Sequence, residues 1–142
     1  MEWKQQFVER YKLLTDVDKF MECSEKPLRK SVRVNTLKTS VKEMKQRMSL
    51  QQTPWCGEGF WLEGEAIGNL PEHFLGYIYL QEAASMIPPE VLQPKEDDLV
   101  IDLCASPGSK TTQAAAMMKN KGLIIANDNQ ISRLKPLQIN LQ

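Results

Sequence analysis

Residues 99–112 decide the fold, and they read Leu-Val-Ile-Asp-Leu-Cys-Ala-Ser-Pro-Gly-Ser-Lys-Thr-Thr. The apolar run at 99–104 is typical of a buried strand, and the residues after it are small and form a loop. Residues 110–119 then contain strong helix formers, including a run of alanines. The stretch therefore predicts a strand, a loop and a helix.

The residues downstream repeat this order. Gly122 is a plausible helix terminator, residues 123–126 form a second apolar strand, and Ile131, Leu134, Leu137 and Leu141 recur at helical spacing. A βαβα order predicts a parallel sheet with helices packed on it. Two strands and two helices cannot cover both faces of such a sheet, so we expect the domain to be incomplete in this polypeptide, either truncated or split.

The residues before this sheet predict a small mixed α+β lobe. Residues 2–14 form an amphipathic pattern whose apolar stripe is expected to join the core. Residues 31–35 alternate like a short strand, and Ser40 with Glu43 has the spacing of a capping box before a helix. Residues 53–70 indicate a short strand between turns. We place this lobe at residues 1–70 and the second domain at 71–142.

Composition restricts the function only weakly. The 142 residues carry 18 basic and 18 acidic side chains, so any basic surface for nucleic acid has to be local. The chain has no apolar run near the roughly 18 residues that span a bilayer and no signal-peptide pattern, so we expect it in the cytoplasm. Its three cysteines are widely spaced and its single histidine has no partner at ligand spacing, which argues against disulfides and metal sites.

The loop after the strand at 99–104 occupies the position where open α/β sheets bind ligands. Its small side chains let a ligand approach the backbone, and amides at a helix start can bind a carboxylate. Asp128 follows the second strand 26 residues after Asp102, where nucleotide-binding sheets place an acid that accepts from ribose hydroxyls. Adenosine is thus a reasonable ligand. The alternative is that Asp128 caps the helix that begins near Gln130.

Two other nucleotide-binding loops are excluded by spacing. A P-loop needs glycine directly before its lysine and another glycine five positions earlier, where this chain has Ser109 and Cys104. A dinucleotide fingerprint needs three glycines, whereas the loop contains only Gly108.

The segment Asp102-Leu-Cys-Ala-Ser-Pro-Gly-Ser-Lys-Thr111 is similar to the Asp-x-Cys-Ala-Ala-Pro-Gly-Gly-Lys-Thr signature of the Sun (RsmB-type) family of S-adenosylmethionine-dependent RNA cytosine-C5 methyltransferases. Three further segments resemble the same family in the same order. They are Ser31-Val-Arg-Val-Asn-Thr-Leu-Lys38, Gly76-Tyr-Ile-Tyr-Leu-Gln-Glu-Ala-Ala-Ser85, and Ala126-Asn-Asp-x4-Arg133-Leu134 continuing to Asn140-Leu141. The resemblance covers nearly the whole chain.

The resemblance implies the start of a Rossmann-like class I methyltransferase sheet that binds S-adenosylmethionine. The residues implied to line its methionine and ribose parts are Cys104, Ala105, Ser106, Pro107, Gly108, Ser109 and Lys110. Asp128 would hold the ribose hydroxyls and Arg133 would lie beside the pocket, with a solvated helix arginine as the alternative for Arg133. Ser106 and Ser109 replace the commoner alanine and glycine of the signature, which affects the expected affinity for the cofactor.

Enzymes of this family attack carbon 6 of cytosine with a cysteine thiolate, which activates carbon 5 for methylation, and a second cysteine helps product release. In the family pattern both cysteines lie beyond the cofactor loop, one of them in a Pro-Cys pair, and this sequence contains no such pair. Cys104 belongs to the cofactor loop, so we assign no catalytic residue.

RNA contact is expected from the basic run Arg29, Lys30, Arg33 and Lys38, with an ordinary solvated face as the alternative. The leading hypothesis is the N-terminal and cofactor-binding portion of an RNA 5-methylcytosine methyltransferase that acts on tRNA or rRNA, with a separate chain as one source of the catalytic half. The competing hypotheses are a non-catalytic RNA-binding or regulatory module, one subunit of a split methyltransferase, and a truncated gene product.

Overall fold

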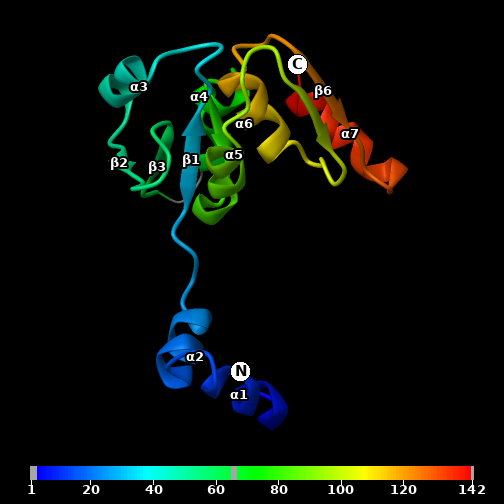
Figure 1. Ribbon diagram of the computed structural model, residues 1–142. Coiled ribbons are helices and arrows are strands. Elements are labelled where there is room, and N and C mark those ends of the chain that lie inside the picture. The colour runs from blue at the N-terminus through cyan, green and yellow to red at the C-terminus, as the bar shows by residue number, and fades with distance from the viewer. Residues whose placement is uncertain (1–2, 65–66, 142) are drawn as a thin grey trace.

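Two separate sheets and a helical hairpin make up the computed structural model, which describes residues 3–64 and 67–141 (Figure 1). In chain order the elements are α1 (Gln5–Lys12), α2 (Val17–Glu25), β1 (Ser31–Val34), α3 (Val41–Arg47), β2 (Gln51–Gln52), β3 (Gly59–Trp61), η1 (Ile67–Asn69), α4 (Pro71–Phe74), β4 (Ile78–Leu80), η2 (Ala83–Met86), α5 (Ile87–Leu92), β5 (Leu99–Asp102), α6 (Ser109–Met117), β6 (Leu123–Ala126) and α7 (Ile131–Asn140). Among the described residues, no helix has the length and apolar content needed to cross a membrane.

The first sheet has the strand order β2-β3-β1-β4, and all of its pairs are antiparallel. All four residues of β1 are buried, because neighbouring elements cover both faces of this central strand. The main apolar core forms around it and includes Val32, Val34, Phe60 and Ile78. The predicted strands at 31–35 and within 53–70 are thereby confirmed. β4 lies beyond the boundary expected at residue 70, yet it pairs with β1, so the first sheet continues to Leu80.

The predicted capping box begins α3. The Ser40 hydroxyl accepts from the Glu43 amide at 3.2 Å, and the Ser40 amide donates to the Glu43 carboxylate at 3.0 Å. These reciprocal bonds satisfy backbone donors at the helix start. They also fix the direction in which α3 leaves the loop, and Met44 on its inner face is fully buried in the core of the first lobe.

The apolar stripe of α1 does not join the core, contrary to the expectation from sequence. No residue of α1 is buried, and Figure 1 shows α1 and α2 at the end of an extended segment, away from both sheets. The stripe instead builds a local aromatic stack, with ring centroids 4.3 Å apart for Phe7 and Tyr11 and 4.9 Å apart for Tyr11 and Phe20. Helical periodicity identified the stripe correctly, but its partner is the neighbouring helix.

The second sheet contains β5 and β6, which pair in parallel with Leu99 opposite Leu123 and Asp102 opposite Ala126. The predicted βαβα order is confirmed, since α6 connects these strands and α7 follows them. On one face the apolar side chains are largely exposed, including Ile101 at 58% and Ile125 at 48%. An apolar surface of this kind on a sheet normally packs against a further layer of structure.

Candidate functional site

The loop between β5 and α6 is braced by the last residue of the strand. Asp102 accepts a hydrogen bond from the Thr111 hydroxyl at 2.6 Å and another from the Cys104 amide at 3.3 Å. One carboxylate therefore ties the strand end to both the loop and the first turn of the helix. Thr111 was not singled out by sequence reasoning, although its place in the first helical turn is where a strand-end carboxylate would reach it.

Gly108 shapes the point at which the loop becomes α6. Its φ is +111°, a conformation that L side chains rarely adopt, and an added Cβ would lie 3.2 Å from Leu137 of α7. The first-turn amides of Ser109, Lys110 and Thr111 have no partner within the helix. They form a donor set for an anion at the carboxyl end of β5.

Asp128, directly after β6, is held in a network with the loop. Its side chain is 2% exposed, and its carboxylate accepts from the Ser106 amide at 3.2 Å and the Gln130 amide at 3.1 Å. Arg133 lies 3.6 Å from the same carboxylate and donates to the Ser106 carbonyl at 2.7 Å. Asp128 thus bonds the amide of Gln130, which is the N-cap residue of α7, and among the described residues no side chain caps the first-turn amides of that helix.

Arg133 has a further contact with the loop, because the Ser106 hydroxyl donates to the Arg133 carbonyl at 2.6 Å. The Arg133 side chain is 47% exposed, so its head group is both hydrogen-bonded and accessible. The structure brings Ser106, Asp128 and Arg133 into contact. Ala105 and Gly108 are buried in the same loop, whereas Cys104, Pro107 and Lys110 are exposed and Ser109 is half-buried.

The first lobe also touches this loop, which the sequence did not indicate. The Pro107 carbonyl accepts from the Asn140 amide at 2.8 Å, and the Tyr79 hydroxyl of β4 lies 3.5 Å from the same oxygen. Burial raises the pKa of Tyr79, although the charge of Arg33 lowers it, so the phenol remains a hydrogen-bond donor at neutral pH. Tyr79 and Asn140 both lie in the segments that resemble the family, but no motif assigned them a role.

A cavity of about 400 Å³ opens beside the loop, between α5, β5 and α6. Asp102, Cys104 and Lys110 line its end at the loop, and apolar residues such as Pro89 and Ile124 line the rest. The cavity and the first turn of α6 therefore share the carboxyl edge of the second sheet, where open α/β sheets bind ligands.

Arg33 does not present its charge to solvent, so the expected contact with RNA phosphates does not fit its position. The residue is 2% exposed, and its guanidinium donates to Gln81 at 2.9 Å and to the Thr112 hydroxyl of α6 at 2.8 Å. Desolvation by burial lowers its pKa to about 10, against smaller opposing effects of nearby anionic groups. Arg33 is buried because β1 is a central strand, and it links the first lobe to α6, the helix that follows the loop after β5.

The network extends from Arg33 across the interior. Gln81 donates to the Gln113 side chain at 2.8 Å, and Gln113 donates to the Met86 carbonyl at 3.0 Å and to Glu90 at 3.1 Å. These contacts cross between the first sheet, α5 and α6. Buried polar groups with partners of this kind fix one relative arrangement of the elements that they join.

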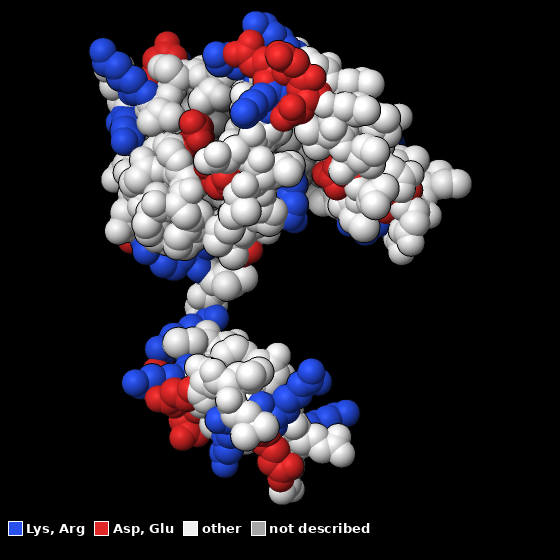
Figure 2. Space-filling model, in the orientation of Figure 1, with Lys and Arg blue, Asp and Glu red and all other residues white. Residues whose placement is uncertain are grey.

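The other expected RNA-contacting residues are exposed but lie apart. Arg29 and Lys30 directly precede β1, whereas Lys38 follows its far end, where its side chain approaches Gly76. Figure 2 shows basic side chains around α3 and at the base of the first lobe, where the chain enters from the hairpin. The basic surface is thus distributed around the first lobe instead of forming one strand face.

Comparisons with known proteins agree over both parts of the chain. A family model described as the N-terminal domain of the 16S rRNA methyltransferase RsmF matches residues 4–83, and one described as 16S rRNA methyltransferase RsmB/F matches residues 89–142. A ribosomal RNA small subunit methyltransferase F from Shewanella sp. (strain ANA-3) is 47% identical over 135 residues, which cover 88% of this chain and 28% of that protein.

Archaeal proteins are also similar. A tRNA (cytosine(49)-C(5))-methyltransferase from Pyrococcus abyssi is 45% identical over 155 residues, covering 99% of this chain and 50% of the relative. A solved methyltransferase homologue from Pyrococcus horikoshii superposes with a TM-score of 0.91 at 40% identity, covering 98% of this chain and 48% of that one. The chain thus spans half or less of these proteins, and its expected fold class is confirmed. The first family match alone covers more than half of the sequence, so the chain belongs to the RsmB/F family of methyltransferases.

Proposed function

We propose that this chain is the cofactor-binding and RNA-contacting portion of an S-adenosylmethionine-dependent RNA cytosine-C5 methyltransferase that acts on rRNA or tRNA. Family membership over both matched ranges supports the reaction, and the names of the Shewanella and Pyrococcus relatives support these two RNA classes. The single observation that carries the proposal is the convergence of the α6 amides and Asp128 on one loop. We assign RNA contact to the lobe that ends with the first sheet and cofactor binding to the remainder.

The donor chemistry of the loop fits the cofactor. The first-turn amides of α6 suit the carboxylate of its methionine part, and the carboxylate of Asp128 suits the two ribose hydroxyls. A carboxylate has about four lone-pair sites, and the Ser106 and Gln130 amides use two of them. Because the Asp128 side chain is 2% exposed, we infer that Arg133 swings aside when a ribose binds. When bound, S-adenosylmethionine supplies the methyl group.

The cysteines of this chain do not supply the nucleophile in this proposal. Cys56 is buried, and desolvation raises the pKa of its thiol to about 12, so it remains protonated at neutral pH. Cys104 belongs to the cofactor loop, and Cys23 lies on α2 in the hairpin. The exposed apolar face of β5 and β6 supports a further layer of polypeptide there, from the same protein or from a separate chain. We assign the protein to the cytoplasm, where its three free thiols would stay reduced.

The proposal is tested by titrating S-adenosylmethionine into the chain by calorimetry. Asp128→Asn keeps one acceptor oxygen and removes the charge, so we expect affinity to fall by about tenfold or more, as for hydrogen bonds to a charged group. Asp97→Asn is the matched control, because Asp97 is an exposed acid in the turn before β5. Circular dichroism must show that both variants are folded.

Equal affinity in wild type and Asp128→Asn would contradict the assigned role of Asp128. A folded chain without measurable affinity for S-adenosylmethionine would remove the cofactor-binding claim for this portion. If such a chain still bound RNA, the competing function, a non-catalytic RNA-binding module, would be favoured. The burial of Cys56, with Cys104 in the loop after β5 and Cys23 in the helical hairpin, is the observation that keeps this second function in view.

A further inference from the structure

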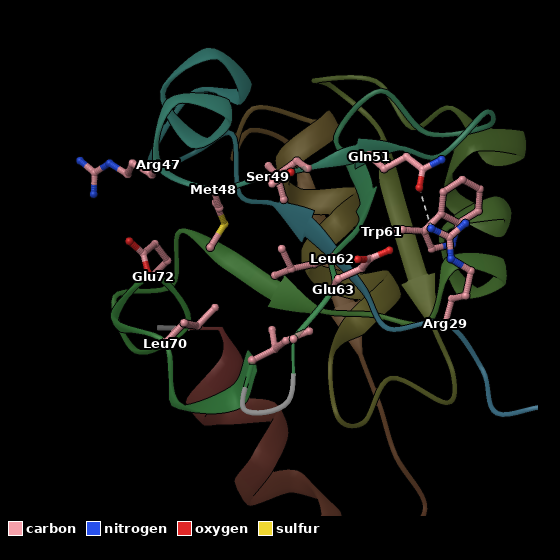
Figure 3. Close-up of a pocket in the computed structure, with 13 residues that line it drawn as sticks. Arg29, Arg47, Met48, Ser49, Gln51, Trp61, Leu62, Glu63, Leu70 and Glu72 are labelled. Carbon is pink, nitrogen blue, oxygen red and sulfur yellow. Dashed lines mark hydrogen bonds between the residues drawn. The ribbon is translucent and has the colours of Figure 1, made fainter.

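A groove of about 650 Å³ lies on the first lobe, away from the cofactor loop (Figure 3). Four segments form it: the chain at Arg29, two residues before β1, the α3–β2 connection, the end of β3 with the residues after it, and the stretch from η1 into α4. Met48, Leu62 and Leu70 give it an apolar lining, and Figure 3 shows them between the charged residues at its two ends. The groove has room for one aromatic base with its sugar.

A stack of planar groups forms one end of this groove. The guanidinium of Arg29 lies 4.4 Å from the ring centroid of Trp61 and donates to the Gln51 side chain at 2.6 Å. Trp55 meets Trp61 edge to face, with centroids 5.9 Å apart at an angle of 88°. Arg29 is exposed. A guanidinium positioned over an aromatic ring offers a planar group on which an unpaired base can stack.

The charge distribution favours a polyanion as the occupant. The whole chain has no net charge, but residues 29–53, which provide about half of the groove lining, contain six basic side chains besides the buried Arg33 and only one acidic side chain, Glu43. Arg29 stands at one end of the groove and Arg47 at the other. Glu63 and Glu72 also line the groove, and their carboxylates can accept from the amino groups of a base.

We propose that this groove binds one unpaired nucleobase of an RNA strand, stacked on Arg29, with the adjoining phosphates near the basic side chains of α3 and the segment before β1. The inference rests on the proposed function, because it gives the RNA-contacting lobe a defined subsite. Stacking of a base on an aromatic ring or a guanidinium does not depend on which base it is, but it requires that the face of the base is exposed. The subsite therefore selects single-stranded or looped RNA over duplex.

Fluorescence anisotropy of a labelled single-stranded oligocytidylate, titrated with the whole chain at fixed salt, tests this inference. Arg29→Lys retains the charge and removes the planar group, so the dissociation constant should rise by at least about fivefold, the lower end of stacking contributions. Arg10→Lys is the matched control, because Arg10 is exposed on α1 and the same substitution there should leave binding unchanged. The same strand paired with oligoguanylate should bind more weakly, and free cytidine monophosphate should compete only at much higher concentration.

Photocrosslinking provides a second readout that does not depend on the variants. Irradiated complexes should carry the nucleotide adduct on a peptide that contains Trp61. Equal affinity of wild type and Arg29→Lys, preferential binding of duplex, or no binding of the single strand would overturn the inference. If the folded chain fails to bind S-adenosylmethionine in calorimetry but Arg29→Lys still weakens RNA binding, the proposed cofactor role is overturned and the RNA subsite stands.

Discussion

Replacing Gln81 with leucine is expected to destabilise the chain more than replacing the buried Arg33 itself. The two side chains share a hydrogen bond of 2.9 Å, and Gln81 also donates to Gln113. Gln81→Leu leaves a buried guanidinium with fewer partners, whereas Arg33→Met removes the charge and retains most of the side-chain volume. Removing Gln81, the neutral partner of this contact, is the costly change, because the charge of Arg33 then remains in the interior with fewer hydrogen bonds.

The magnitudes follow from the burial of Arg33. Its pKa falls from 12.5 to about 10, chiefly through desolvation, which corresponds to roughly 3 kcal/mol against the charged form in the folded state. The hydrogen bonds to Gln81 and Thr112 offset about that amount, at roughly 1.5–3 kcal/mol each. We therefore expect Arg33→Met to lower the free energy of unfolding by about 1 kcal/mol. Gln81→Leu should lower it by about 3 kcal/mol or more, since it also leaves an oxygen of Gln113 without its donor.

Urea unfolding followed by circular dichroism measures both values and the value for the double variant. The double variant should be more stable than Gln81→Leu alone, because removing the guanidinium removes the unpaired charge. Two outcomes would contradict this expectation: Arg33→Met as the more damaging single change, or additive effects of the two substitutions. The first result would mean that the hydrogen bonds of Arg33 outweigh the cost of burying it, and the second would mean that the Arg33 and Gln81 side chains are not energetically coupled.

Three further changes test other parts of the structure. Gly108→Ala should lower the free energy of unfolding by about 2 kcal/mol, because a φ of +111° is strained for a residue with a side chain and the new Cβ would be crowded. Gly57→Ala is the control, since a Cβ there meets nothing within 4 Å, and it should have little effect in the same urea assay. Lys119 and Lys121 lower the pKa of Glu96 to about 2. The stability that this carboxylate contributes is therefore present above its unfolded pKa of 4.5 and is lost as the pH falls towards 2. The difference in urea midpoint between wild type and Glu96→Gln should shrink over the same pH range. Mass spectrometry after brief iodoacetamide treatment at pH 8 should find Cys104 alkylated before Cys56, since Cys56 is buried with a pKa of about 12; faster reaction at Cys56 would contradict this packing.

Patterns that depend on neighbouring residues could be predicted from the sequence. The strand, loop and helix of 99–119 follow from a local change in periodicity, and the capping box at Ser40 follows from a spacing of three residues. The position of the loop after β5 follows in turn from the order of the elements, and the cofactor site proposed there rests on that position.

Features that depend on distant partners could not be predicted in this way. Arg33 has the sequence context of a surface strand, but its partners Gln81 and Thr112 lie 48 and 79 residues further along the chain. The three-residue strand β4 is too short to give a periodic signal, so its pairing with β1 was not predicted. The stack of Arg29 on Trp61 likewise joins residues from separate segments, and only the folded sheet places them together.

The first lobe and the cofactor loop are joined at two points, which bears on how RNA and cofactor would be positioned together. Arg33 of the central strand β1 bonds to Thr112 in α6, and Tyr79 of the neighbouring strand β4 reaches the Pro107 carbonyl in the loop. Both contacts come from adjacent strands of one sheet and end on either side of Gly108. A base bound to the first lobe would therefore keep a fixed position relative to the start of α6. Loosening the Arg33–Thr112 contact should disturb the relative position of the RNA and cofactor sites before it lowers the affinity of either site alone.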